Sequence, residues 1–308
     1  MTKRILLTGA TGYAGGAVGA YLRAAGLNVL TAGRHADDPI VIDLLQPEML
    51  TCAAIPGGMD TCVHTAAVHE VLCCEDPVHA YAANVTATRA LVDAVVAAGM
   101  KRIVYVSTFH VYGHPAGKLD ESGEPLPGND YALTHYLAEQ ILLMVARQKR
   151  VQVNILRAAN LFGVPQDWAT FNRWTLAPFD FVSQAVHSKK IVLNTDGSPV
   201  RHYVSLDRLG ESVLAAIQGR LQPMTHLSGH SWSMRDLSNF VAEVVTKESG
   251  DAVEVVLGNT RPNESAHDFC STHWVAEEDE SAEKMRIFLI GVTHHLLRKN
   301  HESNSSFG

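Results

Sequence analysis

The sequence predicts an α/β protein with a doubly wound parallel sheet and a smaller, mostly α-helical C-terminal lobe. Short apolar runs of strand length alternate with helix-length amphipathic segments through the first half of the chain. Such alternation is typical of a parallel sheet that helices cover on both faces. A glycine-rich turn between the first apolar run and the first helical segment points the same way.

Composition narrows the classes of function. The 308 residues are 46% hydrophobic and 19% charged, which is ordinary for a globular protein. A net charge of −7 with scattered basic residues argues against a nucleic-acid partner. No apolar run reaches the roughly 20 residues of a membrane span. The five cysteines form no C-x-x-C pair and no signal peptide is evident, so reduced thiols and a cytoplasmic location are expected. Of the sixteen histidines, His110 and His114 have a metal-ligand spacing, but Gly113 and Pro115 argue against a helix there, so no metal site is expected.

The glycine turn is the strongest local signal. The run from Ile5 to Leu7 reads as a buried strand, and a helical pattern follows at once. Between them, Gly9 permits a tight turn, Gly12 lets the backbone approach a pyrophosphate, and Gly15 lets the helix pack on the strand. The helix N-terminus adds a positive dipole end for phosphates. This predicts a Rossmann-like dinucleotide site; the alternative is a strand–turn–helix without a ligand.

The end of the second strand bears on which cofactor is used. Residues 28–32 form that strand, and its tip carries Gly33 and Arg34 in place of the acidic residue that holds the ribose hydroxyls of NAD. A guanidinium can bind a 2′-phosphate, so NADP is favoured and NAD remains possible. Alternatively, Arg34 is solvated or stacks on the adenine. Asp43, in a third strand over 40–44, is placed to hydrogen-bond the adenine.

The rest of the first half continues the alternation. A strand ending in small residues leaves room for a ligand at the carboxyl edge of the sheet. A long Gly/Pro-containing loop in this region suggests a functional role. The expected elements are a strand over 61–67, a helix over 77–98, a strand over 103–108, a loop over 114–130, a helix over 131–148 and a strand over 151–157.

The regular alternation stops soon after residue 163, where the chain becomes irregular and aromatic. We therefore expect a dinucleotide-binding domain over 1–165, to which 200–220 returns. A substrate-binding lobe is expected from 166–199 and 221–300. The polar residues 301–308 are expected to be a disordered tail.

Seven ordered motifs resemble the extended short-chain dehydrogenases/reductases, the NAD-dependent epimerase/dehydratase family. The resemblance runs from residue 3 to about 264 and fails beyond that point. The motifs are Thr-Gly-x-x-Gly-x-x-Gly at 8–15, His-Thr-Ala-Ala at 64–67, Asn84, Ser-Thr-Phe-His-Val-Tyr-Gly at 107–113, Arg-Ala-Ala-Asn-Leu-Phe-Gly at 157–163, Arg-His-Tyr-Val-Ser-Leu-Asp at 201–207 and Arg-Pro-Asn-Glu at 261–264.

This resemblance implies an enzyme whose nicotinamide cofactor lies along the carboxyl edge of the sheet. It also implies a homodimer formed through helices equivalent to 78–98 and 131–148. The implied cofactor-binding residues are Gly9, Thr11, Gly12, Tyr13, Ala14, Gly15, Arg34, Asp43, Leu44, Thr65, Ala66, Ala67, Asn84, Ser107, Tyr131 and His135.

The resemblance implies Thr108, Tyr131 and His135 as the catalytic residues, and His135 departs from the family pattern. The family has lysine there, which holds the nicotinamide ribose and lowers the pKa of the tyrosine. Histidine is shorter and mostly neutral at pH 7. One interpretation is an active enzyme with an altered pH dependence. The other is an impaired or non-redox protein that binds a dinucleotide as a sensor or partner.

By the same resemblance, the substrate is a nucleotide-diphosphate sugar. Asn160, Arg201 and Arg261 match positions that hold its diphosphate, and bidentate guanidinium contacts suit such a group. Phe109 and His110 replace the Asp-Glu pair of the family's sugar dehydratases. Epimerisation or carbonyl reduction is therefore favoured over elimination. His110 is a candidate substrate-facing acid or base, or a residue that only holds its loop.

Overall fold

A computed structural model of the chain describes residues 3–34, 38–44, 46, 55–148, 150–261, 267–274 and 282–305. The chain forms two compact units. Unit 1 contains Met1–Ala159, Leu206–Ser228 and His267–Val275, and unit 2 contains Asn160–Ser205, Gly229–Ala266 and Ala276–Gly308. The stretches 221–228 and 267–274, which the sequence analysis assigned to the second lobe, thus belong to unit 1. Conversely, 160–165 and 200–205, which it assigned to the dinucleotide-binding domain, belong to unit 2.

Unit 1 is built on a seven-stranded parallel sheet in the order β11-β7-β5-β4-β1-β2-β3, which confirms the predicted fold class. The third strand is shorter than predicted, because the chain turns at Asp43, whose carbonyl accepts from the N–H of Gln46. The strands are β1 (Arg4–Thr8), β2 (Asn28–Gly33), β3 (Ile40–Val41), β4 (Thr61–His64), β5 (Arg102–Thr108), β7 (Gln152–Ala158) and β11 (Met224–Leu227).

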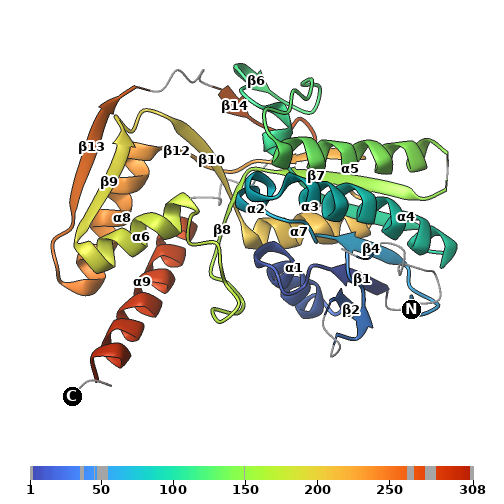
Figure 1. The fold of residues 1–308 in the computed structure, drawn as a ribbon, viewed down its shortest axis with the longest axis horizontal. Coiled ribbons are helices and arrows are strands. Elements are labelled where there is room, and N and C mark those ends of the chain that lie inside the picture. The colour runs from blue at the N-terminus through green and yellow to red at the C-terminus, as the bar shows by residue number, and fades with distance from the viewer. Residues whose placement is uncertain are drawn as a thin grey trace. The chain divides into compact units, whose positions relative to one another are not determined.

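Helices cover both faces of this sheet (Figure 1). On one face, α1 (Tyr13–Ala24) and α7 (Leu206–Ile217) pack so closely that a Cβ on Gly210 would lie 2.5 Å from the Tyr21 ring. The predicted helix over 77–98 is interrupted by a π-helical turn around the buried Asn84. The other face carries α2 (Glu70–Glu75), α3 (Pro77–Tyr81), the π turn η3 (Ala82–Thr86), α4 (Ala87–Ala97) and α5 (Asp130–Arg147).

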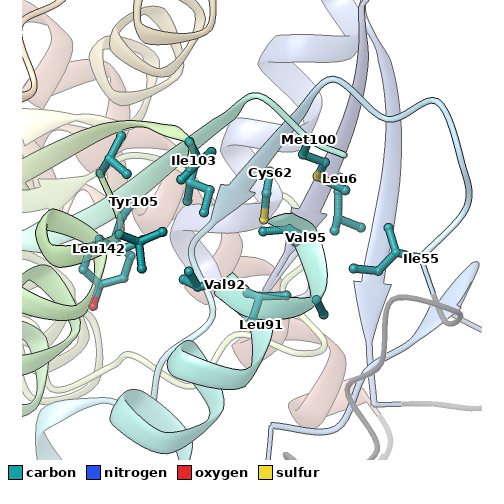
Figure 2. Close-up of a cluster of buried hydrophobic side chains, with 14 of the residues drawn as sticks. Leu6, Ile55, Cys62, Leu91, Val92, Val95, Met100, Ile103, Tyr105 and Leu142 are labelled. Atoms are coloured by element: carbon teal, nitrogen blue, oxygen red, sulfur yellow. The ribbon is translucent and has the colours of Figure 1, made fainter. Parts of the chain in front are cut away.

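A core cluster joins the sheet to α4 and α5 (Figure 2). The strands contribute Leu6, Cys62 and Ile103, and the helices contribute Leu91 and Leu142, all essentially inaccessible to solvent. Burial of each large apolar side chain contributes about 1.5–3 kcal/mol. The cluster therefore holds β1, β4 and β5 in register and fixes where their carboxyl ends lie.

A short parallel sheet ties the late segment 267–274 to unit 1. Strand β14 (His267–Phe269) pairs with β6 (Gly117–Leu119), which lies inside the stretch predicted to be a loop. The Glu121 carboxylate accepts hydrogen bonds from the backbone N–H groups of His226 and Thr272. The segment beyond the family resemblance therefore helps to build the dinucleotide-binding unit.

Among its described residues, unit 2 has two small sheets and three helices. Its sheets are β12-β10-β8 and the parallel pair β13-β9. Its last helix extends to Ser305, so 301–305 are helical where a disordered tail was expected; 306–308 lie outside the described residues. No described helix is long and apolar enough to cross a membrane. The elements are β8 (Asn160–Phe162), α6 (Ala177–Ser188), β9 (Lys190–Thr195), β10 (Val200–Ser205), β12 (Ser231–Ser233), α8 (Met234–Ser249), β13 (Glu254–Thr260) and α9 (Ala282–Ser305).

Candidate active site

The glycine turn after β1, which we call the glycine cradle, is packed so tightly that it has no room for a side chain at Gly9 or Gly15. Gly9 has a φ of +77°, and a Cβ there would lie 2.6 Å from the backbone nitrogen of Ala66. A Cβ on Gly15 would lie 2.1 Å from the carbonyl oxygen of Gly9. Helix α1 begins at Tyr13 with Gly12 as its N-cap, so backbone N–H groups and the positive end of the dipole meet a ligand directly. This cradle fits the pyrophosphate of a dinucleotide.

The segment after β4 forms the wall beside the cradle. The Thr65 hydroxyl donates to the carbonyl of Thr8 over 2.7 Å. The Asn84 side chain accepts from the N–H of Val68 over 2.8 Å and donates to the Thr134 hydroxyl over 3.1 Å. Thr65 and Asn84, both predicted to bind the cofactor, thus hold this wall in place with their side chains. Ala66 and Ala67 contribute only small side chains to it.

The tip of β2 carries a residue that the sequence analysis missed. A Cβ on Gly33 would lie 2.3 Å from Oδ2 and 3.0 Å from Oδ1 of Asp38, so this carboxylate occupies the space of the missing strand-end side chain. Arg34 is exposed at the same tip. The acidic pair Asp37-Asp38 was visible in the sequence, but its spacing alone did not place a carboxylate at the tip.

Asp43 and Leu44 lie where β3 ends. The Asp43 carboxylate accepts from the side-chain amide of Gln46 over 3.3 Å. Leu44 packs partly buried against the core cluster. Asp43 keeps the predicted place near the sheet edge, and Leu44 contributes packing there.

Tyr131 and His135 share one face of α5. The helix begins at Asp130, and the Asn129 side chain caps it by accepting from the N–H of Ala132 over 2.8 Å. Since residues four apart lie one above the other on a helix, the two rings meet edge to face, with centroids 4.7 Å apart. The Tyr-x-x-x-His spacing therefore brings the phenol and the imidazole together as the sequence implied.

The environment of His135 keeps its imidazole neutral. The side chain is buried, and the Tyr105 hydroxyl oxygen lies 2.7 Å from its Nδ1. Burial, followed by repulsion from His64 and His110, lowers the pKa of His135 to about 3. Among the residues that the structure describes, its buried Nε2 has no hydrogen-bond partner. A buried ring nitrogen without a partner fits a hydrogen bond to a hydroxyl group of a cofactor ribose.

Thr108 and His110 lie in the same unit as Tyr131 and His135. Thr108 is buried at the end of β5, and its Oγ1 accepts from the N–H of His110 over 3.2 Å, which caps the 3₁₀ turn η4 (Phe109–Tyr112). The hydroxyl hydrogen of Thr108 remains available to a substrate oxygen. The His110 ring stands edge-on to Tyr131 at 5.9 Å. Thr108, His110, Tyr131 and His135 are thus brought together within unit 1.

Ser107, predicted as a cofactor residue, uses its hydroxyl within a buried network. It donates to the Glu139 carboxylate over 2.6 Å, and Arg157 forms a bidentate ion pair with the same carboxylate. Arg157 also donates to the Tyr112 hydroxyl, and Tyr112 donates to Nε2 of His226 over 2.6 Å. This network joins β5, α5, β7 and β11 beneath the site.

The three residues predicted to hold the substrate diphosphate lie in unit 2. The Asn160 side-chain amide donates to the carbonyl of His202 over 3.0 Å, which leaves its carbonyl oxygen outside that bond. Arg201 is partly exposed on β10. Arg261 is exposed, and after the hydrogen bonds from Ser198 its charge helps to lower the pKa of the Asp196 carboxyl. Pro262, Asn263 and Glu264, the rest of the late motif, lie outside the described residues.

The part of the chain that the structure describes holds no group of three or more His, Cys, Asp or Glu side chains placed to bind a metal ion.

Sequence relatives support the same interpretation. A model of the NAD dependent epimerase/dehydratase family matches residues 5–226. The chain is 28% identical over 264 residues to dTDP-6-deoxy-L-talose 4-dehydrogenase (NAD(P)(+)) of Kitasatospora kifunensis, covering 82% of this chain and 81% of that protein. It is 26% identical over 292 residues to UDP-glucose 4-epimerase of Azospirillum brasilense, covering 85% and 82%.

Solved structures share the fold across the whole chain. UDP-glucose-4-epimerase from Stenotrophomonas maltophila, with bound NAD and formylated UDP-arabinopyranose, has a TM-score of 0.79 at 19% identity, covering 97% of this chain and 100% of that one. RMD from Pseudomonas aeruginosa complexed with NADPH has a TM-score of 0.74 at 22% identity, covering 95% and 98%. With the family model matching more than half of its residues, the chain belongs to the NAD dependent epimerase/dehydratase family of extended short-chain dehydrogenases/reductases.

Proposed function

We propose that this protein is an NAD(P)-dependent epimerase or reductase that acts on a hydroxyl-bearing carbon of a nucleotide-diphosphate sugar. The observation that carries the proposal is the contact between the rings of Tyr131 and His135, whose centroids are 4.7 Å apart. Both residues lie in the unit that also contains the glycine cradle and Thr108. The names of two relatives, a dTDP-sugar 4-dehydrogenase and a UDP-glucose 4-epimerase, support the substrate class.

Each residue has a distinct role in this proposal. The Tyr131 phenol takes or gives the proton of the reacting hydroxyl. The Thr108 hydroxyl donates a hydrogen bond to the same oxygen and orients it. The nicotinamide group, when bound, supplies the acceptor and donor of hydride. His135 donates from Nε2 to a cofactor hydroxyl, and the buried polar atom described above supports this role.

Elimination of water is not part of the proposal. A sugar dehydratase of this family has an acidic pair after the threonine, whereas here Phe109 is buried against Phe269, with ring centroids 5.7 Å apart. A phenyl ring cannot transfer a proton. His110 is the one titratable residue of that pair, so we assign it to contact with the substrate near Tyr131.

For the substrate, we propose that Arg201, Arg261 and Asn160 hold the diphosphate. Guanidinium groups bind such oxygens in pairs. The Asp196 carboxylate near Arg261 is then a competitor that a dianionic diphosphate must displace. Truncating either arginine should raise KM for the sugar nucleotide more than it lowers kcat.

For the cofactor, we propose that both NADP and NAD are accepted. Arg34 offers a guanidinium to a 2′-phosphate, as the sequence suggested. Asp38 offers a carboxylate to a 2′-hydroxyl in the space beside Gly33. The Kitasatospora kifunensis relative, whose name gives NAD(P)(+) as its cofactor, supports such a mixed site.

We further propose a cytoplasmic homodimer. Cys62, Cys73, Cys74 and Cys270 are all free thiols, as expected in a reducing compartment. Val78 is 81% exposed on α3 and Met144 is 37% exposed on α5, on the helices through which the resemblance implies pairing. Sedimentation of the wild type and of Val78→Lys tests this: the substitution should shift a dimer toward a monomer.

The competing proposal is a protein that binds the dinucleotide without redox turnover. The neutral imidazole at position 135 favours it, because the charge of the family's lysine is missing there. Native mass spectrometry should first identify the carried cofactor. Turnover of a panel of UDP-, dTDP- and GDP-sugars by the wild type and His135→Lys then separates the two.

Turnover by the wild type, with a gain or a lower pH optimum in His135→Lys, supports an active enzyme. Absence of turnover by both forms, despite cofactor binding, supports the non-catalytic protein.

A further inference from the structure

Among the residues that the structure describes, Tyr105 is the side chain that forms a hydrogen bond with Nδ1 of His135. It comes from the middle of β5 and is 1% exposed, beside Leu142 in the core cluster (Figure 2). Burial in apolar surroundings, aided by the charges of Glu139 and Tyr131, raises the pKa of Tyr105 well above its usual range. The phenol therefore keeps its proton, and it faces an imidazole that is also neutral.

Two arrangements of protons can join these neutral groups across 2.7 Å. The Tyr105 hydroxyl can donate to Nδ1, which leaves the imidazole hydrogen on Nε2. Alternatively, an Nδ1–H can donate to the phenolic oxygen, and the phenolic hydrogen then needs another acceptor. Within the described residues, His135 is the only polar partner of the Tyr105 hydroxyl. A buried hydroxyl without an acceptor costs about 1–3 kcal/mol, so the first arrangement is preferred.

We propose that Tyr105 is a positioning residue that holds His135 in its Nε2–H tautomer, so that a neutral imidazole donates to a hydroxyl of the dinucleotide where the family uses a lysine ammonium. This inference rests on the dinucleotide site of the proposed function. It goes beyond that proposal by assigning a task to a core phenol that the site motifs do not include. Tyr105 and His135 then act as one unit in place of lysine.

The free protein reports the tautomer without any cofactor. Long-range ¹H–¹⁵N spectra of the histidine rings, assigned by the loss of signals in His135→Gln, should show Nδ1 unprotonated and Nε2 protonated. In Tyr105→Phe, the two nitrogens should exchange the proton and give averaged shifts. An Nδ1–H tautomer in the wild type would overturn the proposal, even if the variant failed to fold.

Cofactor affinity gives the second readout. One hydrogen bond weakened by loss of the tautomer should reduce NAD(P) affinity about 3- to 10-fold in Tyr105→Phe, measured by calorimetry. The matched control is Tyr112→Phe, which removes a buried phenolic oxygen 2.6 Å from His226, away from His135. Its affinity should stay within about 2-fold of the wild type. Equal losses in the two variants would assign Tyr105 a merely structural role.

A double-mutant cycle with His135→Lys sharpens the test. An ammonium donates whatever Tyr105 does, so Tyr105→Phe should have no effect on affinity in the lysine background. An unchanged penalty in that background contradicts the proposal. Failure of the proposed function would look different. If the protein binds the dinucleotide and shows the expected tautomer but turns over no sugar, the enzymatic function is refuted and the role of Tyr105 is retained. If the protein turns over a sugar but shows the opposite tautomer, the enzymatic function is retained and the role of Tyr105 is refuted.

Discussion

Two buried histidines in unit 1 have opposite hydrogen-bond environments. At His64, Thr8 donates to Nδ1 over 2.7 Å, and Nε2 donates to Thr88 over 3.0 Å, since the Thr88 hydrogen is already given to the carbonyl of Asn84. At His135, only Nδ1 has a partner within the described residues. The complete hydrogen bonding of His64 stabilises the fold, whereas the unpartnered Nε2 of His135 is the atom that we propose donates to the dinucleotide.

The Glu139–Arg157 pair extends the closed environment to charged groups. Both side chains are buried, and Ser107 and Tyr112 complete their hydrogen bonds. A buried pair of this kind costs desolvation energy, which only near-complete hydrogen bonding offsets. These fully hydrogen-bonded groups lie beneath the site, and His135, with its unpartnered Nε2 among the described residues, lies at it beside Tyr131. The following predictions test this division.

The largest effect is expected at the open end. Tyr131→Phe removes the proton-transferring hydroxyl and should lower kcat about 10²- to 10⁴-fold. Because the ring and its packing remain, the free energy of unfolding should change by less than about 0.5 kcal/mol. Steady-state kinetics and chemical denaturation measure the two quantities. Undiminished turnover in this variant would refute the catalytic assignment.

The next largest effect is expected in the closed network. Arg157→Met leaves the Glu139 carboxylate buried and unpaired, which should cost about 3–5 kcal/mol of unfolding free energy. The control Arg89→Met breaks the partly exposed pair with Asp93 and should cost less than about 1 kcal/mol. Urea denaturation compares the two variants. Similar losses in both would mean that the network is not buried in solution.

Mild acid should destabilise the protein through its buried histidines. Burial lowers the pKa of His64 and His226 to about 4, and of His135 to about 3. Between those values and about pH 6.5, the histidines of the unfolded chain bind protons that those of the native state do not. Their full contribution to the free energy of unfolding is therefore present above about pH 6.5, and it is lost as the pH falls. Each histidine adds up to about 1.4 kcal/mol per pH unit to this slope.

Denaturation at intervals from pH 7 to pH 5 measures the slope, and His135→Gln should reduce it by the share of one histidine. A flat profile would contradict the neutral, buried state of these rings.

Replacing each of the two histidines by leucine should have smaller effects, on stability at one position and on cofactor affinity at the other. His64→Leu leaves the Thr8 hydroxyl without its acceptor and should cost about 1–3 kcal/mol of stability, with NAD(P) affinity within about 2-fold. His135→Leu should instead weaken NAD(P) binding about 3- to 10-fold. Thermal unfolding and calorimetry on both variants measure this contrast. The reverse pattern would show that the open nitrogen is not a ligand contact.

The smallest effect concerns cofactor choice. Arg34→Ala should weaken NADP binding about 5- to 10-fold and leave NAD nearly unchanged, since the exposed guanidinium serves only the 2′-phosphate. Asp38→Asn should weaken NAD about 3-fold and improve NADP, because it removes a charge that repels the phosphate. Titration of both cofactors against both variants measures these ratios. Parallel losses for the two cofactors would contradict a mixed site.

Much of the fold and part of the site could be predicted from the sequence, because they depend on local order. The strand, the spaced glycines and the helix from residues 4 to 24 are neighbours along the chain, and backbone geometry dictates how they meet. Likewise, the four-residue spacing of Tyr131 and His135 places them on one helix face.

Only the tertiary structure decided what surrounds those residues. The Tyr105–His135 contact joins side chains 30 positions apart, and the Asp38 carboxylate lies beside Gly33 at the tip of β2, where no periodicity places it. The pairing of β14 with β6 brings residues 267–269 to unit 1 from about 150 positions away. The sequence determined which groups exist and which local elements carry them. Long-range packing, which depends on the whole core and leaves no local pattern, decided which polar atoms are closed off and which remain open to a ligand.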